Sequence, residues 1–136
     1  MAQIDITTTR TRVYKDLSLT FALNPITNDV MTVIGDDAVK RSIKNIIMTQ
    51  AGEVPFFPRF GSRLNALLFD PIDPITTALI SSEVEATITG FEPRVKILDL
   101  VVTPSEDEHQ YQVTLTLQLL NQIEPITFTL FLTRLR

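Results

Sequence analysis

Alternation of apolar and polar side chains marks the last third of the chain and predicts a β-sheet. In residues 111–119 every second residue, from Tyr111 to Leu119, is apolar. A period of two is that of a strand with one buried face. Residues 95–102 and 126–133 are also rich in apolar and β-branched side chains, and short polar segments separate the three runs. We therefore predict three strands that pair as an antiparallel meander.

Two earlier stretches have apolar residues three and four positions apart and are predicted to be helices. The first starts at Gly35-Asp36-Asp37, whose carboxylates we expect to cap it, and its apolar spacing continues through Met48. The second has Asp73 as its expected N-cap, Pro74 at its first helical position and Gly90 near its end. The apolar positions that recur at helical spacing and are predicted to be buried are Val39, Ile43, Ile46, Ile47, Ile80, Val84, Ile88 and Phe91.

The first 34 residues predict an arm followed by a small hairpin. Residues 1–16 are polar and rich in threonine, so they have little to bury. Residues 17–23 alternate in polarity and residues 30–34 are largely β-branched, with the turn-forming pairs Asn24-Pro25 and Asn28-Asp29 between them. We expect a flexible arm over residues 1–16 and a single domain over residues 17–136.

Three phenylalanines occupy an irregular stretch between the two long helices. Residues 54–61 contain two prolines and fit neither period, so we expect an ordered loop. Aromatic rings in a loop are buried either beneath the loop or in a neighbouring protein, and the first outcome is the commoner. We therefore expect Phe56, Phe57 and Phe60 to pack within the chain, and Ser62 to cap the short helical turn that follows.

These elements predict an α+β fold. Each strand has one apolar face and each long helix needs cover, so the economical architecture places the two main helices on one face of a small antiparallel sheet of about three strands. The N-terminal hairpin and arm are added to this unit. A length of 136 residues, with 44% hydrophobic and 21% charged side chains, suits one globular domain.

Composition and charge exclude several classes of function. The net charge is −4 and the 12 basic residues are scattered, so the chain carries no electrostatic footprint for nucleic acid. It has no cysteine, and therefore neither a disulfide framework nor a thiolate nucleophile. The apolar runs fall short of the roughly 18 residues needed to cross a bilayer. We expect neither nucleic acid nor membrane as a partner.

The sequence offers little for catalysis. The single histidine, His109, lies in an acidic turn, where a solvated side chain is the common outcome. Phosphate-binding loops and nucleophile elbows are absent from the sequence, so we expect no cofactor and no metal. A glycosidase needs two carboxyl groups about 5 Å or about 6.5–9.5 Å apart. The carboxylates in loops or at element ends are Glu53, Asp70, Asp73 and Glu92, and each has an ordinary structural role.

Glu92, Pro93 and Arg94 stand where the second helix must give way to the first strand. Proline lacks an N–H and disfavours the helical conformation in the residue before it, so the chain turns here. Spacing alone favours a solvated ion pair between Glu92 and Arg94. The planar guanidinium beside a rigid proline also suits a bidentate contact. We predict that Arg94 is paired and partly buried, either with Glu92 or with the carboxylate of a partner.

An ordered series of short motifs runs along nearly the whole chain. In chain order they are Asn24 to Asp29, Ala38 to Ile43, Thr49 to Glu53, Pro58 to Gly61 with Leu64 and Leu68-Phe69, and Phe91 to Val95. Together they resemble the family of small baseplate wedge proteins of contractile-tailed bacteriophages, also called sheath initiators or lysozyme-like baseplate proteins, with a counterpart in type VI secretion baseplates. One departure is Val54, at a position where the family often has a basic residue.

The resemblance implies a structural protein of the virion tail, made in the host cytoplasm, rather than an enzyme. Such a protein joins two larger wedge proteins in a core bundle around the tail tube, and its sheet is the platform for the first ring of tail sheath. Tube or hub proteins are further candidate partners. The resemblance assigns Glu92, Pro93 and Arg94 to the contacts of the wedge bundle. A cell-wall glycoside hydrolase acting through Glu92 and a second carboxylate, and an adaptor unrelated to virions, remain alternatives.

The last predicted strand is a candidate site of strand addition. A three-stranded meander has two edges, and residues 126–133 contain neither lysine nor internal proline to discourage pairing with another chain. We predict that an extended arm of a sheath subunit completes the sheet at Phe128, Leu130 and Leu132. The alternative is that the N-terminal arm or the hairpin covers this edge within the chain.

Overall fold

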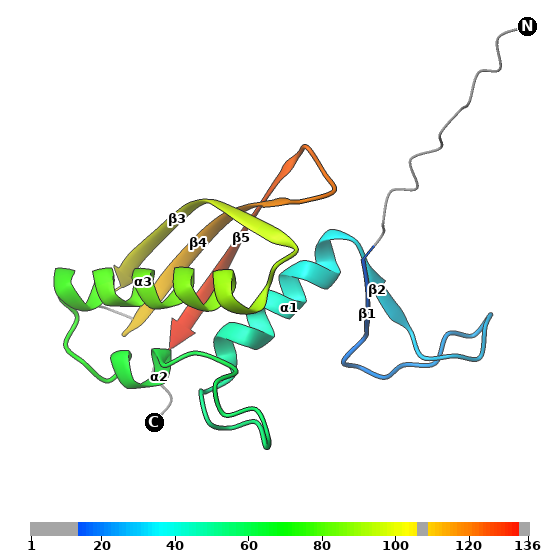
Figure 1. Cartoon of the computed structure of the whole chain (residues 1–136), viewed down its shortest axis with the longest axis horizontal. Coiled ribbons are helices and arrows are strands. Elements are labelled where there is room, and N and C mark those ends of the chain that lie inside the picture. Colours follow the sequence, from blue (N-terminus) through cyan, green and yellow to red (C-terminus); the bar gives the residue numbers. More distant parts are fainter. Residues whose placement is uncertain (1–13, 106–108, 134–136) are drawn as a thin grey trace, which may run out of the picture.

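The computed structural model describes residues 14–105 and 109–133, which form a helical layer on one face of a three-stranded sheet (Figure 1). A separate two-stranded hairpin leads into the first helix. This arrangement confirms the predicted α+β fold class. The elements are β1 (Lys15–Leu17), β2 (Thr32–Ile34), α1 (Asp36–Met48), α2 (Leu64–Leu67), α3 (Pro74–Phe91), β3 (Val95–Ser105), β4 (Gln110–Leu119) and β5 (Pro125–Thr133).

The sheet has the strand order β3-β4-β5 with antiparallel pairing throughout, so the predicted meander is confirmed. Leu115, near the middle of β4, lies opposite Leu100 of β3 and Phe128 of β5. β3 continues to Ser105 through Pro104, which is tolerated because proline can occupy an edge strand. Residues 106–108 of the expected acidic turn lie outside the described residues.

The hydrophobic core fills the space between the helices and the inner face of the sheet. Seven of the eight helical positions predicted to be buried are buried, because the three-to-four spacing places them on the faces that α1 and α3 turn inward. The exception is Phe91, at the end of α3, which is half-buried and lies against Phe60. β4 is the central strand, and its apolar alternation faces this layer. The core side chains that the sheet contributes are Tyr111, Val113, Leu115, Leu117, Leu119, Ile126 and Leu132.

The helix starts differ in how they are capped. Asp73 caps α3 as predicted, because its Oδ1 accepts a hydrogen bond from the N–H of Thr76 at 2.6 Å. This backbone bond lowers the pKa of Asp73. The cap predicted for α1 is wrong: Gly35 is the N-cap without a side-chain bond, and Asp36 and Asp37 lie in the first turn, where their charge still suits the helix dipole. Ser62 was expected to cap α2. Arg63 occupies the N-cap position, but the hydroxyl oxygen of Ser62 accepts a long hydrogen bond of 3.5 Å from the N–H of Leu64, the first residue of α2, while its O–H donates to the carbonyl of Ile47 at 2.7 Å.

The N-terminal hairpin is present, but its first strand is displaced from the prediction. Lys15–Leu17 pairs with Thr32–Ile34, whereas residues 18–23 are irregular apart from a bridge between Leu23 and Val30. The alternating leucines of this stretch are exposed, because no layer lies against them, and Phe21 interrupts the strand with a φ of 47°. β1 therefore begins inside the segment expected to be an arm, and residues 1–13 lie outside the described residues.

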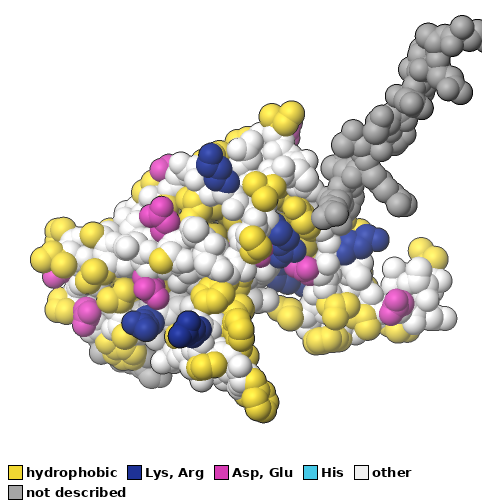
Figure 2. All heavy atoms as spheres, in the orientation of Figure 1, with side chains coloured by type: hydrophobic (Ala, Val, Ile, Leu, Met, Phe, Trp, Pro, Cys, Tyr) yellow, Lys and Arg dark blue, Asp and Glu magenta, His cyan; other side chains and the backbone are white. Residues whose placement is uncertain are grey.

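The expectation that the loop phenylalanines pack within the chain is wrong for two of the three. The side chain of Phe56 is fully exposed, at 103% of its reference area, and Phe57 is 55% exposed. Phe60 is half-buried, and its ring centroid lies 5.2 Å from that of Phe91. The loop projects away from the core between α1 and α2, and hydrophobic atoms form its tip in the space-filling view (Figure 2).

Candidate partner-binding site

The three residues Glu92, Pro93 and Arg94, here called the corner, connect α3 to β3. Glu92 is the last residue to bond into the helix, since its N–H donates to the carbonyl of Ile88 at 2.8 Å. Its own backbone has left the helical conformation, with φ −122° and ψ 78°, because the following proline disfavours that conformation. Pro93 itself is exposed. The chain reverses here, which brings the side chain of Arg94 back over that of Glu92.

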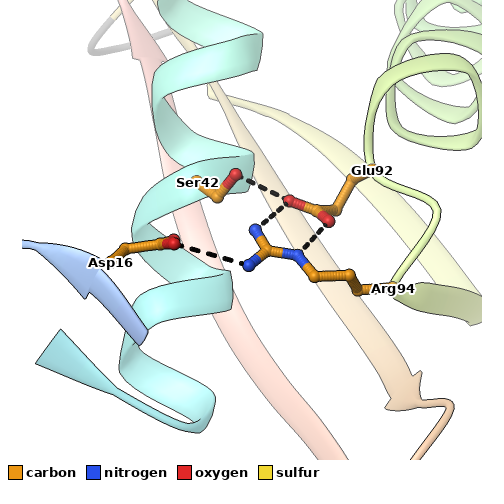
Figure 3. Close-up of polar contacts among 4 residues, drawn as sticks. All are labelled: Asp16, Ser42, Glu92 and Arg94. Atoms are coloured by element: carbon orange, nitrogen blue, oxygen red, sulfur yellow. Dashed lines mark hydrogen bonds and ion pairs between the residues drawn. The ribbon is translucent and has the colours of Figure 1, made fainter. Parts of the chain in front are cut away.

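The guanidinium of Arg94 donates two hydrogen bonds to the carboxylate of Glu92 (Figure 3). Its Nε donates to Oε1 at 2.6 Å and its Nη2 donates to Oε2 at 2.7 Å. Two parallel charge-assisted bonds fix both side chains in one geometry, which lysine cannot reproduce. The prediction that Arg94 is paired and partly buried is confirmed.

Two further elements join the corner. The hydroxyl of Ser42, on α1, donates to Oε2 of Glu92 at 2.6 Å. Asp16, on β1, forms an ion pair with Nη1 of Arg94 at 3.5 Å (Figure 3). The guanidinium also lies 5.3 Å from the centre of the Tyr14 ring, within the range of a cation–π contact. The corner thus ties α1, the N-terminal hairpin and the end of α3 to one another.

The carboxylate of Glu92 is much more deeply buried than the charged groups around it. The Glu92 side chain is 3% exposed, whereas that of Arg94 is 24% exposed and that of Asp16 is 37% exposed. Burial by itself would raise the pKa of Glu92, but the hydrogen bonds from Arg94 and Ser42 outweigh it and hold that pKa below its ordinary value. The hydrogen bond to Glu92 raises the pKa of Arg94. Glu92 is therefore a buried carboxylate that stays ionised.

That state bears on the hydrolase alternative. A general acid of a glycosidase must hold a proton near neutral pH and deliver it to the substrate, so its pKa is raised. Glu92 has a lowered pKa, and both of its carboxylate oxygens are engaged by donors of the chain. The geometry suits a structural clamp rather than proton transfer.

Sequence reasoning missed Asp16, Ser42 and Tyr14 as parts of the corner. Ser42 is 50 positions from Glu92 and sits in a helix whose apolar spacing was explained without it. Asp16 was placed in the arm. Only the packing of α1 and β1 against the end of α3 brings these residues together, and no local pattern signals that packing.

The second candidate surface is the outer edge of β5. In the described part of the chain β5 pairs with β4 alone, and neither the hairpin nor any other described strand lies along its free side. Leu132 is a core residue, and Phe128 and Leu130 are partly buried against the core. These three predicted site residues therefore face the helices, and a strand added at this edge would meet the backbone of β5 rather than their side chains.

Backbone pairing indicates which amides face the free edge. Just beyond β4, Leu120 donates its N–H to the carbonyl of Arg94 at 3.1 Å, toward the β3 side. Because successive residues of a strand point their amides to opposite edges, Leu117 and Leu115 point toward β5. Their partners Ile126 and Phe128 then point back toward β4, which leaves the amides of Thr127, Thr129 and Phe131 at the free edge. Pro125 fits this alternation, since it falls on the outward side and has no N–H to give.

The rest of the described structure adds no other chemistry to these surfaces. No group of three or more His, Cys, Asp or Glu side chains is placed to hold a metal ion in residues 14–105 and 109–133. His109 is exposed, next to the residues of the turn that are not described. Across the same residues, no helix combines the length and apolarity required to span a bilayer.

The chain is similar to known proteins in both sequence and fold. The model of the family "Baseplate wedge protein gp25" matches residues 34–124. Baseplate wedge protein gp25 of Enterobacteria phage T4 is 30% identical over 98 residues, which cover 72% of this chain and 74% of that protein. The matched segment includes the corner, Ser42 and the loop with the three phenylalanines.

Two solved structures share the fold. A chain in the cryo-EM structure of the anti-feeding prophage baseplate has a TM-score of 0.70 and 24% identity, over 82% of this chain and 90% of that one. A Geobacter sulfurreducens protein, whose crystal structure was described as that of a candidate tail lysozyme, has a TM-score of 0.61 and 24% identity, over 72% of this chain and 91% of its own. At this level of identity the likeness establishes the fold.

Proposed function

The chain belongs to the baseplate wedge protein gp25 family, which makes it a structural component of a contractile-tail baseplate, and on that premise we propose its role there. It joins larger wedge proteins in a bundle around the tail tube, and it offers the edge of its sheet to an extended arm of the first ring of sheath subunits. In this role the chain from Tyr14 onward acts as a single domain, because β1 and the corner include Tyr14, Lys15 and Asp16.

The free edge of β5 is the observation that carries this proposal. β5 is nine residues long, has a regular register with β4, and has no described neighbour on its other side. An unpaired edge of this length presents a row of backbone donors and acceptors to any extended segment that reaches it. Its exposed side chains are mostly threonine, and Thr129 lies 3.5 Å from Thr114 across the outer face, hydroxyl to hydroxyl.

The corner supplies the contact with the larger wedge proteins. Arg94 keeps about a quarter of its side chain exposed after binding Glu92, and Pro93 beside it is exposed. The bonds from Ser42 and Arg94 hold the surface in one conformation before any partner arrives, which lowers the entropy lost on binding. A partner carboxylate or backbone carbonyl could then meet the outer side of the guanidinium, where Asp16 now lies.

We further propose that the protein has no cell-wall hydrolase activity. The engaged state of Glu92 supports this. Its lowered pKa does not suit a general acid, and the donors on both of its oxygens leave neither oxygen free to attack a substrate or a water as nucleophile or base. Purified protein that cleared peptidoglycan, and lost that activity on Glu92→Gln while staying folded, would contradict the proposal.

A proline at the free edge tests the role of β5. Thr129→Pro removes an outward N–H and leaves the ladder with β4 intact, so the variant should fold and enter baseplates. It should then block pairing with a sheath arm. Thr129→Val is the matched control, because it keeps the N–H and the β-branched shape. The readouts are the amount of this chain in purified tails and the fraction of those tails that carry sheath in electron micrographs.

The expected result is sheathless tails with Thr129→Pro and normal tails with Thr129→Val. If tails with the proline variant carry a normal sheath, strand addition at β5 is wrong. If the wild-type chain is missing from purified tails and is found elsewhere in the cell, the placement in the baseplate is wrong as well.

A further inference from the structure

The loop of residues 54–60, which we call the aromatic knob, is exposed where aromatic side chains are normally buried. Phe56 is fully exposed and Phe57 is more than half exposed, although each ring could bury about 150–250 Å² elsewhere. The knob projects between α1 and α2 and ends in hydrophobic atoms (Figure 2). Pro55 and Pro58, on either side of the two rings, restrict the backbone conformations that the loop can adopt.

Backbone contacts clamp the base of the knob. The N–H of Ala51 donates to the carbonyl of Ser62 at 2.9 Å, and the N–H of Ser62 donates to the carbonyl of Thr49 at 2.8 Å. Gly61 has a φ of 104°, and a Cβ there would collide with the carbonyl oxygen of Thr49, so only glycine allows the two ends of the loop to meet this closely. The knob is therefore fixed on the end of α1 rather than loosely attached.

The backbone at the tip of the knob is strained, and this strained conformation holds the side chain of Phe56 out in solvent. Phe56 has a φ of 66°, in the left-handed region that bulky residues rarely occupy. Turns on both sides hold it there, since Phe57 donates to the carbonyl of Val54 at 3.2 Å and Phe60 donates to that of Phe57 at 3.0 Å. A strained, fully exposed aromatic ring gains nothing for the isolated fold, which points to a use in binding.

Aromatic contacts connect the knob to the corner. The ring centroids of Phe57 and Phe60 are 6.1 Å apart, and those of Phe60 and Phe91 are 5.2 Å apart. Phe91 directly precedes Glu92, so an apolar path runs from the tip of the knob to the clamp. A protein that binds the corner can extend along this path to reach Phe56.

We propose that Phe56 inserts into an apolar pocket on the larger wedge protein that also binds the corner, with a carboxylate at the rim of that pocket facing Arg59. Arg59 is exposed three residues from the tip, and among the described residues it forms no ion pair. The identity of the partner as a wedge protein rests on the proposed function. The pocket chemistry rests on the knob alone, because a rigid aromatic side chain flanked by arginine is typical of a binding hot spot.

Competition for places in the particle tests the proposal. A host that makes the particles would express the wild-type chain and a variant in equal amounts, and mass spectrometry of purified tails would give the ratio of the two peptides that contain residue 56. Truncating a hot-spot aromatic typically costs more than about 2 kcal/mol, or about thirtyfold in affinity. We expect Phe56→Ala to be under-represented at least about tenfold. Ile123→Ala is the control, since Ile123 is 91% exposed in the turn between β4 and β5.

Stability of the purified variants separates binding from folding. Phe56→Gly suits the positive φ, so its Tm should equal or exceed that of the wild type, and it should be excluded from particles as strongly as Phe56→Ala. A photo-crosslinking phenylalanine analogue at residue 56 should then attach to the same wedge protein as the same analogue at Asn45, which is exposed on α1 one turn after Ser42.

Equal incorporation of Phe56→Ala and wild type would overturn the proposal. Crosslinking from residue 56 to a second copy of this chain, or to a sheath or tube subunit, would also overturn the proposal, as would a failure of residue 56 to crosslink to any protein. Absence of the wild-type chain from purified tails would instead overturn the proposed function itself, because the knob would then have no baseplate partner to bind.

Discussion

Replacement of Arg94 by alanine should destabilise the free chain strongly, because it strips a buried carboxylate of its main partner. Glu92 is 3% exposed and would keep only the hydrogen bond from Ser42 among the side-chain bonds that the structure shows. Breaking a buried ion pair by removing one partner costs about 3–5 kcal/mol. We expect Arg94→Ala to lower the unfolding free energy by about 3 kcal/mol, the lower end of this range, because the Arg94 side chain is 24% exposed and water can reach Glu92 once it is gone.

Urea unfolding of the purified chain measures this loss, and the corresponding drop in Tm is roughly 10 °C for a domain of this size. Arg94→Lys keeps the charge and loses the second bond to Glu92, so it should cost about 1–2 kcal/mol. Arg59→Ala is the matched control, an exposed arginine whose loss should change the unfolding free energy by less than about 0.5 kcal/mol. If Arg94→Ala lies as close to the wild type as the control does, the corner is a solvated contact and the reasoning is refuted.

Two further predictions concern single groups. The pKa of Glu92 is lowered in the folded state, so the stability that its carboxylate contributes is present above the unfolded-state pKa of about 4.3 and is lost as the pH falls through the folded-state pKa. Glu92→Gln should therefore make the unfolding free energy fall less steeply with decreasing pH below about pH 5. An unchanged slope would count against the clamp. The hydroxyl of Tyr111 is buried, and no residue in the described part of the chain hydrogen-bonds to it. Tyr111→Phe should therefore leave the unfolding free energy unchanged or raise it by up to about 1 kcal/mol, and a decrease of more than about 1 kcal/mol would contradict the prediction.

The core could be predicted from the sequence because periodicity and burial act on the same residues. The alternation in β4 is strict because β4 is the central strand, paired on both sides and covered on one face. The start of α3 could also be predicted from the sequence, since Asp73 and Pro74 each satisfy a local requirement of a helix terminus. Such features are decided within a few residues, or by one apolar face, and a sequence records them directly.

The corner could be predicted only in part. The turn and the pairing of Glu92 with Arg94 follow from a proline between two opposite charges, which is a local signal. The near-complete burial of Glu92 does not follow, because it depends on Ser42 and Asp16, which reach the corner through the packing of α1 and β1. Spacing alone favoured a solvated ion pair, and the tertiary structure made it a clamp.

The errors in the first half of the chain have a common physical origin. The alternating residues 17–23 were assigned to a strand of a small hairpin and the ring of Phe56 to burial beneath its own loop, but the apolar side chains of both segments are exposed. The general rule is that apolar side chains are buried where they can be. A subunit of a larger assembly follows that rule over all of its contacts, including those with other chains. Local apolar pattern without an intramolecular layer to receive it is therefore a sign of a partner, and it falls in this molecule on the hairpin and the aromatic knob, the two segments that project farthest from the sheet (Figure 1).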